Sequence, residues 1–271
     1  MLSAAGPANQ SSERLTATVE SHVGGPAERP WLVALVLSVV LPAHNEQDYL
    51  EAAVVDLVKG LRSRERPFEV IVCENGSTDA TAALADDLST RFPEVRALTA
   101  DEPDYGRALR AGFLAATGEM VANFDVDYID LAFLDAAWDL VTAEGGPAAV
   151  VASKRSADAD DTRAIGRRVV TAAFSLVLRR GFGLQVSDTH GMKVLRRAVL
   201  APIVTQCRFG GDLFDTELIL RTERAGLRVA ELGVTVRDTR PPRTPITKRI
   251  PRSLAGLAKL RLVLWRERLG R

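Results

Sequence analysis

The feature that most constrains the fold is a regular alternation of short apolar runs with longer stretches of helical periodicity between residues 32 and 153. The apolar runs have the length of strands and end at polar or turn residues, which is typical of buried parallel strands. The intervening stretches carry apolar residues at helical spacing. The pattern predicts strands at 32–41, 68–73, 95–99, up to Asp125 and at 148–153, with helices at 46–64, 79–91, 105–117 and 131–143.

Alternating strands and helices predict an α/β doubly wound sheet with right-handed crossovers. In such sheets ligands bind at the carboxyl ends of the strands. Three polar clusters follow predicted strands, namely Pro42–Glu46, Glu74–Ser77 and Asp125–Asp127. We therefore expect these clusters to meet along one rim and to form a binding site.

The third cluster indicates a metal. Alternation along an extended chain would aim Asp125 and Asp127 to the same side, with Val126 pointing away. Two carboxylates so close repel each other unless a cation lies between them, and Mg²⁺ is often held by one or two carboxylates together with phosphate oxygens. The alternative is a solvated turn with two surface acids, since Asp-x-Asp is a common pattern.

The net charge of zero conceals two oppositely charged halves. Residues 1–150 contain 10 Lys and Arg against 24 Asp and Glu, and residues 151–271 contain 25 against 11. The acidic half suits a metal, and the basic half suits phosphate or an anionic membrane surface. Nothing in this pattern predicts a nucleic-acid partner.

Compartment signals favour the cytoplasm. Two cysteines, Cys73 and Cys207, make no disulfide framework. Residues 1–30 are polar, lack the apolar core of a secretory signal and are predicted to be a disordered tail. The longest apolar run, 31–41, is too short to span a bilayer.

A dinucleotide-binding domain is excluded because it requires Gly-x-Gly-x-x-Gly after the first strand, and here that strand ends in Pro-Ala-His-Asn-Glu. A nucleotidyltransferase would likewise show a glycine-rich phosphate loop at this position. The nucleotidyltransferase therefore stays open only as a remote alternative.

Four segments together resemble the family 2 glycosyltransferases, which have the GT-A fold, and most of all the polyprenyl- (dolichyl-) phosphate sugar synthases within them. The segments are 41–46 (Leu-Pro-Ala-His-Asn-Glu), 72–79 (Val-Cys-Glu-Asn-Gly-Ser-Thr-Asp), 105–112 (Tyr-Gly-Arg-Ala-Leu-Arg-Ala-Gly) and 124–127 (Phe-Asp-Val-Asp). The resemblance runs from about residue 36 to about residue 250 and implies a Rossmann-like doubly wound mixed sheet.

The resemblance also implies roles for residues of the nucleotide-binding half. Pro42, His44 and Glu46 would line the nucleotide pocket. Glu74 stands where the family usually has Asp and would hydrogen-bond the base, while Asn75 replaces a second Asp.

The same comparison places Gly106 in a loop that closes over the nucleotide, and gives Asp125 and Asp127 to a metal, Mg²⁺ or Mn²⁺, on the diphosphate. A third ligand of related synthases would fall on Ile129, which cannot serve, so Asp130 is a substitute to test.

Less specific interpretations stay open for several of these residues. His44 could be a turn residue, and Glu74 and Asn75 could merely shape the turn that Asn-Gly favours. Asp104 and Asp130 are predicted to be loop or helix-capping acids.

In the basic half, Arg155 follows the strand that ends at Ser153 and matches an arginine that faces the active site in related enzymes. It is a candidate for phosphate binding, because Arg suits planar bidentate contacts. Arg167 and Arg168 match a phosphate-contacting arginine of polyprenyl-phosphate synthases and precede an apolar helix at 169–178. That helix either lies in a membrane interface or packs in the core or a dimer.

The segment 187–193 resembles a family segment of the form Asp-x-x-x-Gly-Phe-Arg/Lys with altered spacing, so either Asp188 or Ser187 takes the acidic position. His190 within it is a predicted acceptor contact. Asp215 and Glu217 begin a helix where related enzymes place acids near the acceptor, although both could be first-turn acids favoured by the helix dipole. Asp215, Glu217 and Asp188 are the candidate catalytic bases.

The last part of the chain is basic. Lys248 and Arg249 lie in a predicted basic loop where related synthases carry a mobile Ser-Lys segment, and both are predicted acceptor contacts. Residues 251–271 are predicted to form a basic amphipathic helix with Leu and Trp on it. Such a helix is suited to a membrane interface, and the rival interpretation docks it on its own domain or on a partner subunit.

The prediction is an inverting, metal-dependent glycosyltransferase with a GT-A domain at 31–250, divided into a nucleotide-sugar half at 31–153 and an acceptor half at 154–250. The donor would be a UDP- or GDP-sugar and the acceptor a polyprenyl phosphate at the inner face of the membrane. The leading alternative is a hydroxyl of a soluble small molecule or natural product. A nucleotidyltransferase, a non-catalytic nucleotide-sugar-binding protein and a homo-oligomer also stay open.

Overall fold

The computed structural model describes residues 37–154, 165–235 and 246–269. The predictions for residues 1–30 and for Arg155 lie outside this part of the chain, as do the side chains of Arg167, Arg168, Lys248 and Arg249. The elements, in chain order, are β1 Leu37–Ala43, α1 Leu50–Arg62, β2 Phe68–Asn75, α2 Thr81–Arg91, β3 Val95–Ala100, α3 Tyr105–Ala115, β4 Met120–Asn123, α4 Leu131–Thr142, β5 Ala149–Ser153, α5 Ile165–Phe182, β6 Lys193–Arg196, α6 Arg197–Gln206, α7 Leu213–Arg224, β7 Val229–Gly233 and α8 Ile246–Leu269.

The described strands form one mixed sheet of seven strands in the order β3-β2-β1-β4-β6-β5-β7. β1 to β4 are parallel, as predicted from the alternation of strands and helices. β6 runs antiparallel between β4 and β5, and β7 is parallel to β5. The sheet is mixed because β6, which runs opposite to its two neighbours, is inserted between β4 and β5.

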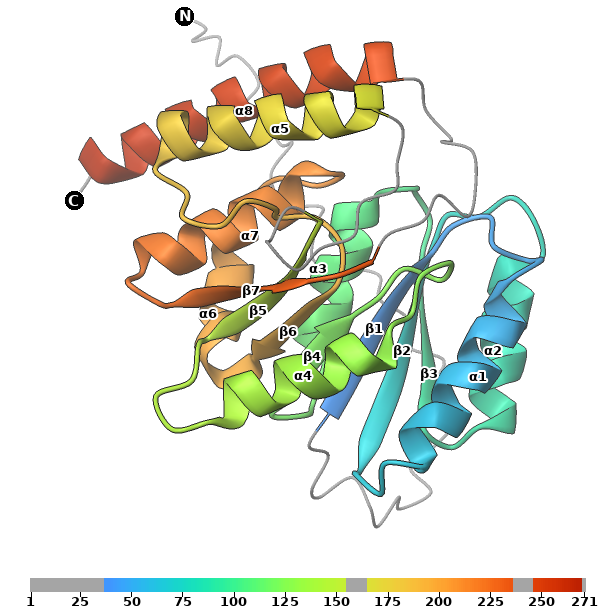
Figure 1. Ribbon diagram of the computed structural model, residues 1–271. Helices are drawn as coiled ribbons and strands as arrows, with labels where there is room; N and C mark the ends of the chain where they lie inside the picture. The colour runs from blue at the N-terminus through green and yellow to red at the C-terminus, as the bar shows by residue number, and fades with distance from the viewer. Residues whose placement is uncertain (1–36, 155–164, 236–245, 270–271) are drawn as a thin grey trace, which may run out of the picture.

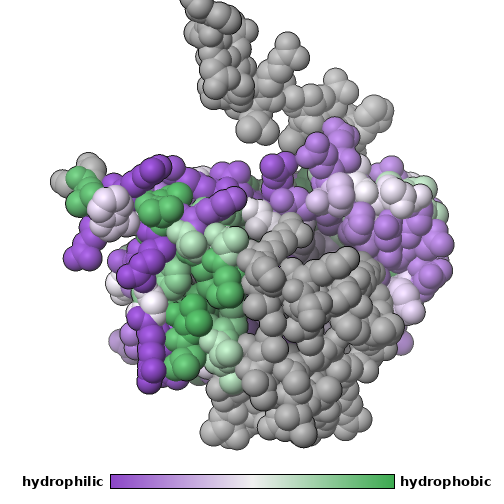
Figure 2. Space-filling view, turned by 90° about the horizontal axis from the view of Figure 1, so that it is seen from above, coloured by the Kyte–Doolittle hydropathy of each residue, from purple (hydrophilic) through white to green (hydrophobic). Residues whose placement is uncertain are grey.

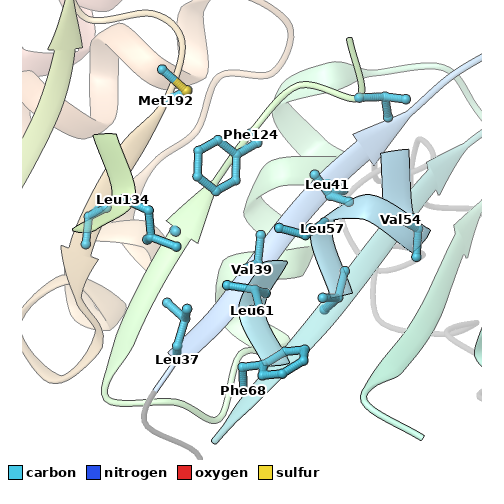
Figure 3. Packing of buried hydrophobic residues seen from close by; sticks show 14 of the residues in the cluster. Leu37, Val39, Leu41, Val54, Leu57, Leu61, Phe68, Phe124, Leu134 and Met192 are labelled. Carbon is cyan, nitrogen blue, oxygen red and sulfur yellow. The ribbon is translucent and has the colours of Figure 1, made fainter. Parts of the chain in front are cut away.

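Helices cover both faces of this sheet, as Figure 1 shows. Apolar residues of α1, α2 and α4 pack on one face and those of α3, α6 and α7 on the other. Figure 3 shows the first of these cores, where Leu57 and Leu61 of α1 lie over Val39 and Leu41 of β1. This packing explains why β1 and β2 read as unbroken apolar runs, since both of their faces are buried.

A further layer lies outside the second face. Helices α5 and α8 run side by side over α7 (Figure 1), and their buried residues form a third apolar cluster with it. None of the described helices is long and apolar enough to cross a membrane.

Two predictions about the C-terminal region need correction. Lys248 and Arg249 are not in a loop, because α8 begins at Ile246 and continues through Pro251. A proline near the start of a helix of 24 residues removes one hydrogen bond, and the remaining turns keep the helix. The helix also begins earlier than the boundary at 251 and is docked on its own domain through Leu257, Leu260 and Leu264.

Candidate active site

Hydrogen bonds between side chains and backbone join the loop after β1 to the loop after β2 at the carboxyl edge of the sheet. His44 Nδ1 lies 2.9 Å from the carbonyl oxygen of Asn75. The Asn45 N–H donates to Ser77 Oγ at 3.0 Å, and the Thr78 N–H donates to Asn45 Oδ1 at 2.8 Å. These bonds join the loop after β1 to the loop after β2, so the first two predicted clusters do meet at one rim.

Glu74 and Asn75 at the end of β2 are buried and bonded to backbone. Glu74 Oε1 accepts the N–H of Ser77 at 2.6 Å. The Asn75 side chain donates to the carbonyl of Ala43 at 3.1 Å and accepts the N–H of Asp104 at 2.9 Å. Both residues therefore shape the turn, as the less specific interpretation holds, and their predicted contacts to a nucleotide stay predictions.

Two further residues predicted to line the nucleotide pocket, Pro42 and Glu46, lie at the end of β1 and just after it. Pro42 is buried within β1, where it is paired with Cys73. Glu46 is buried, and its N–H donates to Thr81 Oγ1 at 2.7 Å at the start of α2. Gly76 has a φ of +63°, a left-handed conformation that favours glycine at this turn.

Gly106 is not in a loop. It lies in the first turn of α3, after Asp104, whose side chain caps the helix by accepting the Arg107 N–H at 2.9 Å. A Cβ at this position would lie 2.6 Å from both the Gly211 carbonyl oxygen and Phe214 Cβ. The glycine therefore allows α3 to approach the start of α7, which brings the second half of the chain against the first.

Asp125 and Asp127 lie in a tight turn and not on an extended chain. The Tyr128 N–H donates to the Asp125 carbonyl at 2.9 Å, and the two residues form an isolated antiparallel bridge. The turn arises because β4 ends at Asn123 and α4 starts at Leu131, so the chain must reverse within a few residues. Asp125 is half-buried in this turn and Asp127 is exposed.

The surroundings of Asp125 are mostly negative. Burial raises the pKa of its carboxyl, and the charges of Asp215 and Asp127 raise it further, against the opposing effects of Lys193 and of the Tyr105 hydroxyl. Tyr105 Oη donates to Asp125 Oδ1 at 3.1 Å. A carboxylate held near two others is under-neutralised and favours a cation.

A buried ion pair lies beside this turn. Lys193 Nζ is 2.9 Å from Asp215 Oδ1, and both side chains are fully buried. Lys193 also donates to the Gly191 carbonyl at 2.7 Å. The pairing of β6 with β4 sets Lys193 opposite Asn123, just before the Asp125 turn. The sequence analysis gave Lys193 no role of its own, and its one signal there was its place at the Arg/Lys position of the segment 187–193.

These residues fit a divalent cation held on a diphosphate. Among the described residues no group of three or more His, Cys, Asp or Glu could enclose a metal. A metal that shares its coordination with phosphate oxygens and water needs only one or two protein carboxylates, which Asp125 and Asp127 supply. Asp130 does not serve as a further metal ligand here, because it caps α4 by accepting the Phe133 N–H at 2.9 Å. The capping roles predicted for Asp104 and Asp130 are thus confirmed.

Glu217 on α7 is fully buried and its carboxylate is used by neighbours. Oε2 accepts the N–H groups of Arg208 at 2.8 Å and Phe209 at 2.9 Å, and Oε1 accepts from Arg221 Nε at 2.8 Å. Arg221 in turn bonds Glu267 on α8 at 3.0 Å. These contacts tie α7 to α8, so the geometry favours a structural use of Glu217 over the predicted catalytic one.

Asp188 and His190 lie in the loop that leads to β6. Asp188 Oδ1 accepts the His190 N–H at 3.1 Å, and the Asp188 N–H donates to Glu231 at 3.3 Å. His190 Nε2 lies 2.9 Å from the Asp212 carbonyl, and its ring lies 6.0 Å from the ring of Phe174 on α5. The loop thus links α5 to the start of α7.

Comparison with known proteins identifies relatives over most of the chain. Residues 38–203 match the sequence profile described as "Glycosyl transferase family 2". The chain is 32% identical over 238 residues to an uncharacterised glycosyltransferase of Mycobacterium tuberculosis, covering 85% of this chain and 96% of that protein. It is 32% identical over 221 residues to the glycosyltransferase AglD of Haloferax volcanii, covering 78% of this chain but only 35% of AglD.

Two more similarities concern ligands. The chain is 24% identical to a dolichyl-phosphate beta-glucosyltransferase of Dictyostelium discoideum over 215 residues, which cover 74% of this chain and 66% of that one. Among solved structures, glucosyl-3-phosphoglycerate synthase of Mycobacterium tuberculosis in complex with Mn²⁺, UDP and glucosyl-3-phosphoglycerate superposes with a TM-score of 0.57. It is 26% identical, and the match covers 81% of this chain and 76% of that one.

Proposed function

Because the chain belongs to glycosyl transferase family 2 and is a glycosyltransferase of the GT-A fold, we propose that it transfers a sugar from a UDP- or GDP-sugar to a polyprenyl phosphate with inversion at the anomeric carbon. Transfer would take place at the carboxyl edge of the sheet, where the loops after β1, β2 and β4 meet. The proposal extends to the donor, the acceptor and the stereochemistry, which the family alone leaves open.

The donor side rests on the Asp125–Asp127 turn. These two carboxylates would hold Mn²⁺ or Mg²⁺, which supplies charge neutralisation of the departing nucleoside diphosphate. Tyr105 holds one oxygen of Asp125, and the Lys193–Asp215 pair lies behind it. The loops after β1 and β2, which are hydrogen-bonded to each other, would orient the nucleotide, and Arg155 is proposed to contact its phosphates. UDP is favoured because a similar solved enzyme binds it.

The acceptor side rests on how the candidate bases are used. A hydroxyl acceptor requires a group that takes its proton, whereas a phosphate is already an anion and requires none. Glu217 is filled by three donors, and Asp215 is fully buried against Lys193. Only Asp188 among the three predicted bases lacks such a cationic partner among the described contacts. Because Glu217 and Asp215 are already used by neighbouring groups, the structure offers few bases for a hydroxyl, which favours an acceptor that is ionised before it binds.

A phosphate acceptor also agrees with the positive charge of residues 151–271. Arg167, Arg168, His190, Lys248 and Arg249 are proposed to position it. The similarity to a dolichyl-phosphate beta-glucosyltransferase supports a lipid-linked phosphate. Such an acceptor would place the enzyme at the cytoplasmic face of a membrane as a peripheral protein.

A soluble acceptor is the second candidate. One similar solved enzyme carries glucosyl-3-phosphoglycerate in its site, so a small phosphorylated acid fits the same architecture in that protein. In that case the sugar would be transferred to a hydroxyl, and Asp188 would be the proposed base.

The test is a direct competition of acceptors. Purified protein is incubated with UDP-glucose or GDP-mannose and Mn²⁺, and with either a short-chain polyprenyl phosphate or 3-phosphoglycerate. We expect sugar in the lipid-phosphate product, loss of transfer with EDTA, and loss of transfer in Asp127→Ala. Transfer to 3-phosphoglycerate alone would replace the proposed acceptor by the soluble one. Full activity of Asp127→Ala would remove the metal assignment.

A further inference from the structure

Helix α8 has two apolar faces, and only one of them is buried. Leu257, Leu260 and Leu264 face the domain and pack against residues of α5 and α7. The opposite face carries large apolar side chains that are between 49% and 66% exposed, namely Leu254, Leu262, Trp265 and Leu269. At 100° per residue these four and the exposed Ala258 fall within about 80° of one another. The helix therefore has an apolar stripe that its own domain does not cover among the described residues.

Helix α5 adds to the same surface. Ala173, Leu176 and Val177 are exposed on it, while its Leu178 is buried in the cluster shared with α8. Arg261 of α8 donates to the Gly181 carbonyl at the end of α5 and lies over the Phe182 ring, so the two helices are in contact. Figure 2 looks down on this layer and shows apolar side chains gathered between hydrophilic ones. We name this surface the α5/α8 face, made of Ala173, Leu176, Val177, Leu254, Ala258, Leu262, Trp265 and Leu269.

The rim of the α5/α8 face is basic. Lys259 and Arg266 lie on the side of the α8 stripe away from α5, Arg268 lies on the other side, and Arg261 lies between the stripe and α5, all of them exposed. Arg179 and Arg180 are exposed at the end of α5. The one acid of α8, Glu267, is turned to the protein and bonds Arg221 at 3.0 Å. The described part of α8 thus presents Leu, Trp and cations to the outside without an opposing acid.

We propose that the α5/α8 face lies in the interface of a lipid bilayer that contains anionic headgroups. A helix that lies in the interface buries Leu and Trp at the headgroup boundary while Lys and Arg on its flanks contact lipid phosphates. The charge of the rim complements such a surface. A second copy of the chain would bring like-charged rims together, which argues against a symmetric dimer through this face.

This docking would bring the membrane close to the loop of residues 187–190, which includes the proposed acceptor contact His190. Phe174 of α5 packs against His190, and Ser175 Oγ of α5 donates to the Ser187 carbonyl, so one helix separates the face from residues 187–190. In Figure 1, α5 and α8 lie across the end of the molecule toward which β1 points. The proposal that this face binds a membrane does not depend on the reaction. The further step, in which the bound membrane presents a lipid-linked phosphate to the site, rests on the proposed function.

The experiment measures cosedimentation of the full chain with vesicles of phosphatidylcholine and phosphatidylglycerol. The test variant is Leu262→Glu/Trp265→Glu on the α5/α8 face. The matched control is Leu114→Glu/Leu140→Glu, two exposed leucines on α3 and α4 outside this face. We expect the test variant to lose at least about ten-fold in vesicle affinity and the control to bind like the wild type.

A charge arm tests the rim. Arg266→Glu and Arg268→Glu should each weaken binding by at least about five-fold, and the effect should fall with added salt, whereas the exposed Lys59→Glu on α1 should not change it. Circular dichroism checks that every variant is folded.

Three results would overturn the inference. The first is a wild type that does not sediment with vesicles, and the second is a test variant that binds vesicles like the wild type. The third is a wild-type dimer in sedimentation velocity that becomes a monomer in the test variant and not in the control, which would assign the face to a second copy. A parallel assay separates this inference from the proposed function. If the wild type binds vesicles but transfers sugar to no polyprenyl phosphate, the docking stands and the acceptor is wrong. If the test variant transfers to a short-chain acceptor in solution but not to a long-chain acceptor in vesicles, both stand.

Discussion

Two carboxylates at opposite edges of the sheet, Glu69 and Asp125, have opposite surroundings, and their pKa values are shifted in opposite directions. Glu69 lies at the start of β2 and accepts from Ser38 Oγ at 2.7 Å and from both the N–H and the hydroxyl of Thr117 at 2.8 Å. Arg96 completes the site at 2.7 Å. Burial alone would raise the pKa of Glu69, but these donors and the charge of Arg96 outweigh it and lower the pKa.

Asp125 at the carboxyl edge has the opposite surroundings. Among the described residues the Tyr105 hydroxyl is its one side-chain donor, and burial together with the neighbouring charges of Asp215 and Asp127 raises its pKa. The amino edge of the sheet therefore neutralises its acid with several donors, while the acid at the carboxyl edge lies near other negative charges. This difference separates Glu69, whose charge is satisfied within the fold, from Asp125, which we propose to be a metal ligand.

The largest effect should follow when the carboxyl-edge site is broken. Asp125→Asn removes a proposed metal ligand, and we expect the rate of sugar transfer to fall by about 10³-fold or more. The free energy of unfolding should stay the same or rise, because the substitution removes one of several neighbouring negative charges. Initial rates with Mn²⁺ and calorimetry of the metal-free protein measure the two effects.

Asp130→Asn is the matched control, since Asn caps a helix as well as Asp and this residue caps α4 five positions away. It should leave both activity and stability nearly unchanged. Wild-type activity in Asp125→Asn would show that the comparison between the two edges carries no functional meaning.

The parallel half of the fold was predictable from the sequence because its signals are local. β1 to β4 are bounded by polar residues, and the helices between them show their own periodicity, so each element could be placed without knowledge of its partners. The insertion of β6 between β4 and β5 could not be predicted in this way. A four-residue strand such as Lys193–Arg196 has no periodicity to recognise, and its position depends on pairing with residues about 70 positions earlier.

The candidate site was predictable to the level of clusters but not of contacts. The carboxyl-edge rule brought Pro42–Glu46, Glu74–Ser77 and Asp125–Asp127 to one rim. The tight turn at Asp125 was missed because alternation along a strand was extended beyond the point where the strand ends. The Lys193–Asp215 pair was missed because it joins β6 to α7, two elements that only the tertiary fold brings together.

The second prediction concerns the amino edge. Glu69→Gln removes the charge that Arg96 and the Thr117 backbone stabilise, and we expect the free energy of unfolding to fall by about 3 kcal/mol. Affinity for Mn²⁺, measured by calorimetric titration of the folded variant, should not change. The exposed pair of Glu51 with Arg91 gives the control, because Glu51→Gln should cost less than about 1 kcal/mol. An equal loss of unfolding free energy in Glu69→Gln and Glu51→Gln would show that the buried network stabilises the protein no more than an exposed ion pair does.

The third prediction tests whether Lys193 and Asp215 act as a structural pair. Each of Lys193→Met and Asp215→Asn leaves one buried group without its partner, so both should destabilise the protein. In the double variant the loss should be smaller than the sum of the two by about 2 kcal/mol. Urea unfolding of the four proteins gives this coupling. Additive losses would show that the two charges do not stabilise each other, and that Asp215 is available for another role.

The smallest effect is a difference in pH dependence, and its sign distinguishes the two edges. The folded-state pKa of Glu69 is lowered, so the unfolded chain binds the proton more readily, and the stability that Glu69 provides is lost as pH falls through its folded pKa. The folded-state pKa of Asp125 is raised, so in metal-free protein its ionisation removes stability as pH rises through the window between its unfolded and folded pKa values. Relative to wild type, Glu69→Gln should therefore lose less stability on acidification, whereas Asp125→Asn should lose more. Urea unfolding of the metal-free proteins across the acidic range measures both slopes, and slopes of the same sign would contradict the assignment of one edge to stability and the other to binding.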